Sequence, residues 1–139
     1  MKTLLRVVLL GTTVCSCALA QQSRPVSDED MRVVHFEKMY YPPTAQAISK
    51  EGLVVVNLKL DMDGNVVDAE ALSGSVPLVR DSLDNSRKWR FKPNSQKAAV
   101  LVYNYRIVGM CLDNTEPAQF KLDQPNFVSV TGCAKRNVD

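Results

Sequence analysis

The pattern of apolar and polar positions is clearest in the middle of the chain, where two β-rich runs enclose a short polar turn. Leu53 to Leu60 is rich in valine and leucine, with polar residues at two outward positions, and Val66 to Leu72 forms a second run. Asp63-Gly64 lies between them, and glycine accepts the positive φ that tight hairpin turns require. The pattern therefore predicts an antiparallel β-hairpin.

Helical patterns lie on both sides of this hairpin. Apolar residues three to four positions apart predict an amphipathic helix from Pro77 to Lys88. A shorter helix is predicted from Ala45 to Lys50, with Thr44 as its N-cap. The longest β-like run, Ala99 to Val108, follows the second helix. The order is helix, strand, strand, helix, strand.

This order predicts an α+β fold in which two helices cover one face of a three-stranded sheet. The second helix returns the chain to the starting end of the sheet, so the third strand runs parallel to the second. The first strand is antiparallel to both and lies between them. A right-handed crossover then gives the strand order 2-1-3, with Ala99 to Val108 at an edge of the sheet.

The first 20 residues predict a cleaved export signal. Lys2 and Arg6 precede an uncharged stretch from Val7 to Ala20, and Ala18-Leu19-Ala20 fits the small-x-small pattern of a signal peptidase site. The uncharged stretch is shorter than the about 20 residues of a spanning helix. We therefore expect a periplasmic or otherwise exported protein. An uncleaved anchor is the alternative.

A second alternative is a lipid anchor in the envelope. Val14-Cys15-Ser16-Cys17 partly resembles a bacterial lipobox with Cys17 as the acylated residue, although a cysteine before the last serine is unusual there. Contact with a membrane is expected only if Cys17 is lipidated or the N-terminus is uncleaved. The sequence leaves both routes open.

Composition and charge add little to this picture. The chain has 139 residues, of which 45% are hydrophobic and 23% charged, as in one small globular domain. The formal charge of +2 is due to Lys2 and Arg6 alone, because acids balance bases in the rest of the chain. The charge therefore gives no indication of nucleic acid.

Cys111 and Cys133 are the cysteines that remain after cleavage at Ala20. An even pair in an oxidising compartment usually forms a disulfide, and this spacing suits neither a Cys-x-x-Cys redox motif nor a zinc site. The bond would tether a C-terminal extension. The predicted organisation is a signal peptide (1–20), a polar leader (21–39), the α+β domain (40–109) and this extension (110–139).

The sequence offers little catalytic or metal-binding chemistry. His35 is the only histidine and has no evident nucleophile or carboxylate partner. The acidic hairpin resembles part of a calcium loop, but Val66 stands where glycine is required and Leu72 where a bidentate acid is required. We therefore predict a protein that is not an enzyme, with no cofactor and no metal site.

A basic cluster surrounds Trp89 and Phe91. Its members are Arg87, Lys88, Arg90, Lys92 and Lys97. We interpret the charges as a solvated helix end and Trp89 as a core residue. An anionic partner, such as an acidic peptide or a lipid headgroup, is the alternative.

Together these features resemble the C-terminal domain of TonB, the energy transducer of Gram-negative bacteria. The residues that carry the resemblance are Tyr41, Pro42, Gly52, Asp63, Gly64, Trp89, Arg90, Phe91 and Pro93. The resemblance implies a periplasmic module that binds an extended peptide of an outer-membrane receptor beside its last strand. Strand addition of this kind uses the free main-chain groups of a sheet edge. On this chain the edge would comprise Ala99, Leu101, Val102, Tyr103, Asn104, Tyr105 and Arg106.

The chain departs from a full transducer. A transducer has an uncleaved membrane anchor and a long proline-rich spacer, whereas this chain has 7 scattered prolines. It also has an extra tail with two β-like runs, Gln119 to Leu122 and Asn126 to Thr131. We hypothesise that the tail returns beside the third strand and partly occupies the binding edge, because a bare apolar edge invites aggregation.

Two functions follow from the sequence. The first is an exported, non-catalytic module that binds an extended peptide of an envelope or outer-membrane transport protein by strand addition. The alternative is a structural or envelope-assembly protein whose edge strand is capped by its own tail.

Overall fold

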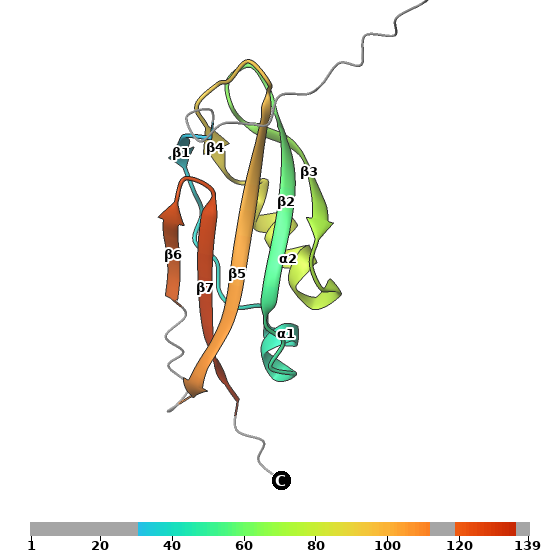
Figure 1. Cartoon of the computed structure of the whole chain (residues 1–139), viewed down its shortest axis with the longest axis vertical. Coiled ribbons are helices and arrows are strands. Elements are labelled where there is room, and N and C mark those ends of the chain that lie inside the picture. The colour runs from blue at the N-terminus through green and yellow to red at the C-terminus, as the bar shows by residue number, and fades with distance from the viewer. Residues whose placement is uncertain (1–30, 112–118, 136–139) are drawn as a thin grey trace, which may run out of the picture.

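The computed structural model describes residues 31–111 and 119–135, which form a twisted five-stranded sheet, a two-stranded ribbon and two helices (Figure 1). The elements in chain order are β1 (Val33–His35), α1 (Pro43–Ala47), β2 (Gly52–Leu60), β3 (Val66–Ser73), α2 (Val76–Ser86), β4 (Arg90–Phe91), β5 (Ala98–Met110), β6 (Gln119–Gln124) and β7 (Phe127–Ala134). The large sheet has the order β3-β2-β5-β7-β6, and β1 pairs with β4 in the ribbon. The fold is α+β, as predicted.

The predicted β2–β3 hairpin is present. The Asp61 carboxylate accepts hydrogen bonds from the backbone amides of Asp63 and Asn65, both at 2.9 Å, and so closes the turn. Gly64 has a φ of 84°, and a Cβ built there would lie 1.8 Å from the carbonyl oxygen of Phe91. The turn therefore requires glycine for its backbone conformation and also for its close contact with β4.

The three predicted strands are β2, β3 and β5, and their order in the sheet is the predicted one. The prediction that the sheet has only three strands is wrong. β2 lies between β3 and β5 and is antiparallel to both. β7 then pairs in parallel with β5, from Val102↔Phe127 to Met110↔Ala134, and β6 pairs with β7. The hypothesis that the tail returns beside the third strand is thereby confirmed.

The predicted free edge is consequently wrong for most of its length. Its proposed members were Ala99, Leu101, Val102, Tyr103, Asn104, Tyr105 and Arg106. Val102 to Tyr105 pair with β2 on one side and with β7 on the other, and Arg106 pairs with β7. The physical reason is that the tail has an apolar face of its own. Val128 and Val130 are fully buried, which requires β7 to lie beside β5.

Both helices lie on the same face of the sheet, since α1 contacts both α2 and β7 (Figure 1). α2 ends at Ser86, two residues before the predicted end. α1 begins at Pro43, and Pro42 takes the N-cap position without a side-chain hydrogen bond, so the prediction of Thr44 as N-cap is wrong. Proline suits the first helical position because its missing N–H would have no partner there.

The β1–β4 ribbon was not predicted. Val33 pairs with Phe91, and Met31 is buried at 4% exposure, so residues 31–39 are part of the folded domain and the prediction of a polar leader is wrong there. A three-residue strand and a two-residue strand are too short to show a period. Residues 1–30, including the predicted signal and Cys17, lie outside the described residues. Within the described part, neither helix is long and apolar enough to cross a membrane.

Candidate functional site

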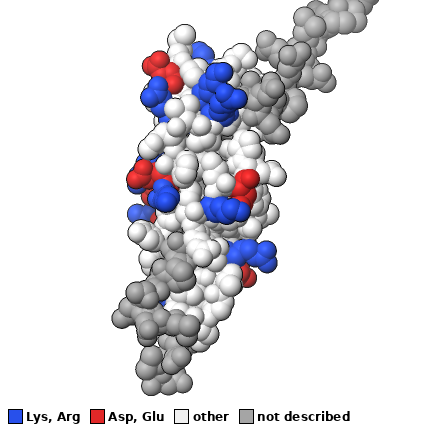
Figure 2. Space-filling model, turned by 90° about the vertical axis from the view of Figure 1, so that its left-hand side faces the viewer, with Lys and Arg blue, Asp and Glu red and all other residues white. Residues whose placement is uncertain are grey.

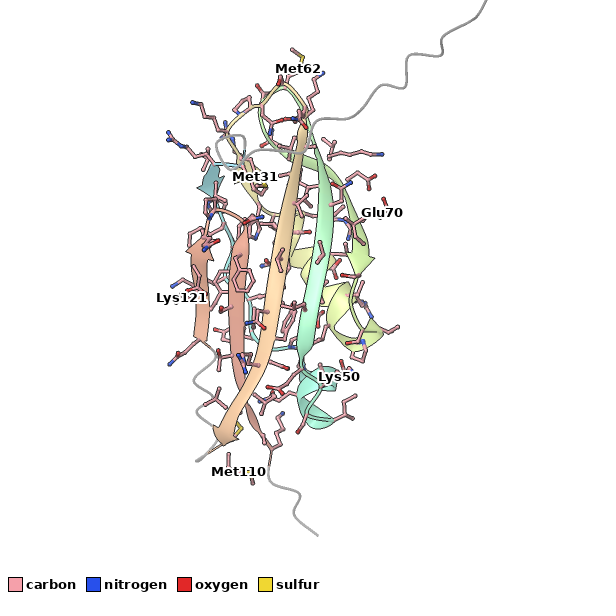
Figure 3. All side chains as sticks on the ribbon, viewed as in Figure 1. Met31, Lys50, Met62, Glu70, Met110 and Lys121 are labelled. Carbon is pink, nitrogen blue, oxygen red and sulfur yellow. A yellow bond between two sulfur atoms is a disulfide. The ribbon has the colours of Figure 1, made fainter. Side chains whose placement is uncertain are left out.

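The outermost strand on the tail side of the sheet is β6. One edge of β6 pairs with β7, and no strand of the described part pairs with its other edge. Phe120 and Leu122 are opposite the buried Val130 and Val128, so their side chains point toward the helix-covered face. Lys121 projects outward beyond the sheet (Figure 3). A partner strand could reach the main chain of β6 from this side.

A groove of about 520 Å³ lies between β6 and the extended segment Lys38–Tyr40. Its lining residues are Lys38, Met39, Tyr40, Gln119, Phe120 and Lys121. Tyr40 is 79% exposed, which is unusual for a side chain of its size. The Phe36 ring stacks on Phe120, a lining residue of the groove, with ring centroids 5.9 Å apart.

A second groove, of about 570 Å³, lies on the other side of the same segment, toward α2. Asp81 and Asp84 of α2 line this groove, together with Lys88, which follows the helix. The segment Lys38–Tyr40 therefore forms a ridge between two depressions. A ridge of this kind can contact a partner on both of its flanks.

Asn85 holds the residues beneath the ridge in place. Its side-chain oxygen accepts hydrogen bonds from Trp89 Nε1 and from the Tyr103 hydroxyl, both at 2.9 Å. Its side-chain nitrogen donates to the carbonyl oxygen of Glu37, also at 2.9 Å. One buried side chain of α2 thus joins three segments: Glu37 just before the ridge, Tyr103 of β5, and Trp89 just before β4.

The tyrosines of β5 belong to the core of the domain. Tyr103 and Tyr105 are at most 1% exposed, and the Tyr105 and Ser82 hydroxyls are 2.6 Å apart. Burial, with a smaller contribution from Tyr105, raises the pKa of Tyr103 far above its ordinary value. Burial also raises the pKa of Tyr105, against the opposing hydrogen bond from Ser82. These side chains are therefore neutral and belong to the core. The predicted role needed only the main chain of this strand, and that main chain is already paired with β2 and with β7.

The predicted disulfide is present between Cys111 and Cys133. It joins the ends of β5 and β7, where the Cys111 amide also donates to the Ala134 carbonyl at 3.0 Å. Gln46 of α1, only 1% exposed, donates a hydrogen bond of 2.9 Å to the carbonyl oxygen of Cys133. The burial of Gln46 and Asn85 was not predicted, because a polar residue inside a helical pattern looks the same in the sequence whether it is buried or exposed.

The residues of the family motif meet at two places. Tyr41 is buried, and its hydroxyl donates to the carbonyl oxygen of Lys50, just before Gly52 opens β2. At the other end of the sheet, Gly64 lies against Phe91 and Pro93, while Asn65 bridges to Arg90. Asp63 is in the same turn, and Trp89 packs on Phe91 with centroids 6.1 Å apart. These motif residues position the backbone of the domain.

The charged side chains of the described part form no evident catalytic or metal centre. No group of three or more His, Cys, Asp or Glu side chains there could hold a metal ion. His35 pairs with Glu37 at 3.6 Å on the surface. Trp89 is 2% exposed, which confirms its assignment to the core.

Residues 37–107 match the family model described as Gram-negative bacterial TonB protein C-terminal. The chain belongs to this family. The match covers about half of the 139 residues and ends inside β5, so β6 and β7 lie beyond it. A search of the curated proteins finds no match to the chain.

Membership of the TonB C-terminal family indicates the class of partner and the cell compartment. Domains of this family mediate protein interactions in the periplasm of Gram-negative bacteria, with partners such as outer-membrane receptors. In this member the hairpin of β6 and β7 occupies the side of β5, so the described sheet ends at β6.

Proposed function

We propose that this chain is an exported, non-catalytic protein-interaction module that adds an extended segment of an envelope transport protein to the outer edge of β6. The observation that carries the proposal is the position of β6, which ends the sheet and has the Lys38–Tyr40 groove directly beside it. Family membership supports a protein partner in the envelope.

Strand addition at β6 would use two sources of affinity. The free N–H and C=O groups of β6 give main-chain hydrogen bonds that depend little on the partner's sequence. Alternate side chains of the added strand would point into the groove, where Tyr40 and Phe120 offer aromatic surface. Aromatic residues at a groove commonly supply most of the binding free energy of a small interface.

A second candidate is the structural or envelope-assembly role, in which the tail is a permanent cap. The burial of Val128 and Val130 and the Cys111–Cys133 bond favour it, since both hold β7 on β5. In this case the protein would bind no extended peptide at β6. The two candidates differ in that single respect.

A peptide titration followed by amide NMR distinguishes them. The probes are synthetic peptides from the extended periplasmic segments of outer-membrane receptors. Under strand addition, shifts concentrate in Gln119–Gln124 and Lys38–Tyr40, and Tyr40→Ala weakens binding by about tenfold. Met62→Ala is the matched control, because Met62 is also 79% exposed and lies at the tip of the β2–β3 hairpin (Figure 3). If no amide signal shifts at millimolar peptide concentration, the structural role, in which the tail is a permanent cap on β5, is favoured.

Export and domain organisation complete the proposal. We propose that residues 1–20 are a signal peptide and that the mature chain is released to the periplasm, with acylation of Cys17 as the alternative. The intact mass of the purified protein separates cleavage after Ala20, lipidation of Cys17 and retention of the whole N-terminus.

A further inference from the structure

The β1–β4 ribbon presents a basic outer face. Val33 and Phe91 are register partners, and both point inward: Phe91 is fully buried and Val33 packs against the core. Alternation along each strand therefore turns Arg32, Arg90 and Lys92 outward together. The Lys92 amide donates to the Arg32 carbonyl at 2.8 Å, which fixes the two chains beside each other. We call Arg32, Val34, Arg90 and Lys92 the ribbon patch.

The ribbon patch differs from the basic cluster suggested by the sequence. Arg87, one member of that cluster, forms an ion pair with Asp84 at 3.1 Å. In contrast, no ion pair within residues 31–111 and 119–135 involves the three cations of the patch. The acid that follows β1, Glu37, is paired with His35. The fold thus adds Arg32 to Arg90 and Lys92 and leaves all three charges exposed.

An apolar side chain lies among these charges. Val34 is 59% exposed at an irregularity of the ladder, where His35 is the register partner of Arg90. An acidic peptide would pair with the cations but would make no use of an exposed valine beside them. It suits a lipid surface, where the charges meet headgroup phosphates and the apolar side chain enters the interfacial region.

We propose that the ribbon patch binds the surface of a membrane that contains anionic phospholipid. Figure 2 shows Lys and Arg side chains at the upper end of the face that includes β6, with an acidic side chain beside them and further charged side chains of both signs across its middle. The strands β1 and β4 lie at the upper end in Figure 1. Such contact would orient the domain on the membrane. This proposal for membrane binding does not depend on strand addition at β6.

The test is cosedimentation of the full chain, carrying Cys17→Ser so that no lipid is attached, with phosphatidylglycerol–phosphatidylcholine vesicles and with pure phosphatidylcholine vesicles. We expect binding to the anionic vesicles that exceeds binding to the neutral ones and that weakens in 0.5 M salt. Each basic residue near an anionic surface contributes to this attraction, so Arg32→Gln, Arg90→Gln and Lys92→Gln together should lower the partition coefficient at least tenfold.

The control variant removes the same residue types elsewhere: Lys59→Gln, Arg80→Gln and Arg106→Gln, all at exposed positions. It should retain most of the binding. Val34→Ser should weaken binding while leaving its salt dependence unchanged, and it keeps the test usable if the triple variant does not fold. Equal loss in the control, absence of binding to anionic vesicles, or full displacement by polyglutamate would overturn the proposal. The last result would indicate an acidic protein segment.

Discussion

The ring of Tyr41 lies directly against the backbone of Gly132. A Cβ built on Gly132 would come within 2.8 Å of two ring carbons of Tyr41. Tyr41 belongs to the family motif, whereas Gly132 belongs to β7, beyond the part that matches the family. The core of the domain and its C-terminal extension are therefore packed against each other as one unit.

The first prediction concerns this contact. Gly132→Ala should lower the free energy of unfolding by about 1–3 kcal/mol, because the added methyl group overpacks the site. Urea unfolding followed by circular dichroism measures the change. In a Tyr41→Ala background the same substitution should cost much less, since the ring is gone. An equal loss of stability in both backgrounds would show that the Tyr41 ring is not what excludes a side chain at position 132.

The second prediction concerns the side chain that joins three segments. Asn85→Ala should destabilise the protein by about 2–5 kcal/mol, because it leaves the Trp89 indole N–H and the Tyr103 hydroxyl buried without their acceptor. Thermal unfolding gives the magnitude, and near-ultraviolet circular dichroism reports the loosening of Trp89. The control is Asn57→Ala. Asn57 is half-buried in β2, and its side chain points away from the core, so the change in stability should be about 0.5 kcal/mol or less.

The third prediction concerns the disulfide. Cys111 and Cys133 are 22 residues apart, and closure of a loop of this length contributes about 3 kcal/mol in the chain-entropy model. Reduction with dithiothreitol should lower the urea midpoint accordingly. Hydrogen exchange should accelerate first at the Cys111 end of β5 and in β7. Unchanged exchange there after full reduction would mean that packing alone holds the tail.

The fourth prediction concerns alkaline pH. Burial, together with the negative charge of Glu51, raises the pKa of Tyr41 to about 12, and burial raises the pKa values of Tyr103 and Tyr105 as well. The folded state therefore holds these protons more tightly than the unfolded state does. The resulting stabilisation is complete below pH 10, the ordinary tyrosine value, and is lost as the pH rises through 12 and beyond.

Urea midpoints between pH 8 and 12, with absorbance at 295 nm to follow tyrosinate, test this dependence. Stability should decline only above about pH 10, in step with tyrosine ionisation. Tyr41→Phe keeps the ring on Gly132 and should reduce the slope of the decline, because one of the three protons no longer takes part. A decline that begins at neutral pH would contradict the assignment.

The candidate site was predictable only in part. The strand Ala99 to Val108, the returning tail and the Cys111–Cys133 bond all follow from alternation and cysteine count, because these signals are local or compositional. The error was to treat the last strand of the family match as the edge of the sheet. Which strand ends a sheet depends on whether a later segment has an apolar face that must be covered, and here Val128 and Val130 provide one.

The sequence by itself determined the α+β class, the β2–β3 hairpin, the crossover through α2 and the family, because each of these rests on periodicity or on a short motif. Only the tertiary structure decided that β6 ends the sheet, that Asn85 and Gln46 are buried, and that Arg32 joins Arg90 and Lys92. Those features depend on pairing between segments that are far apart in the chain, and a single sequence carries no direct signal for such pairing.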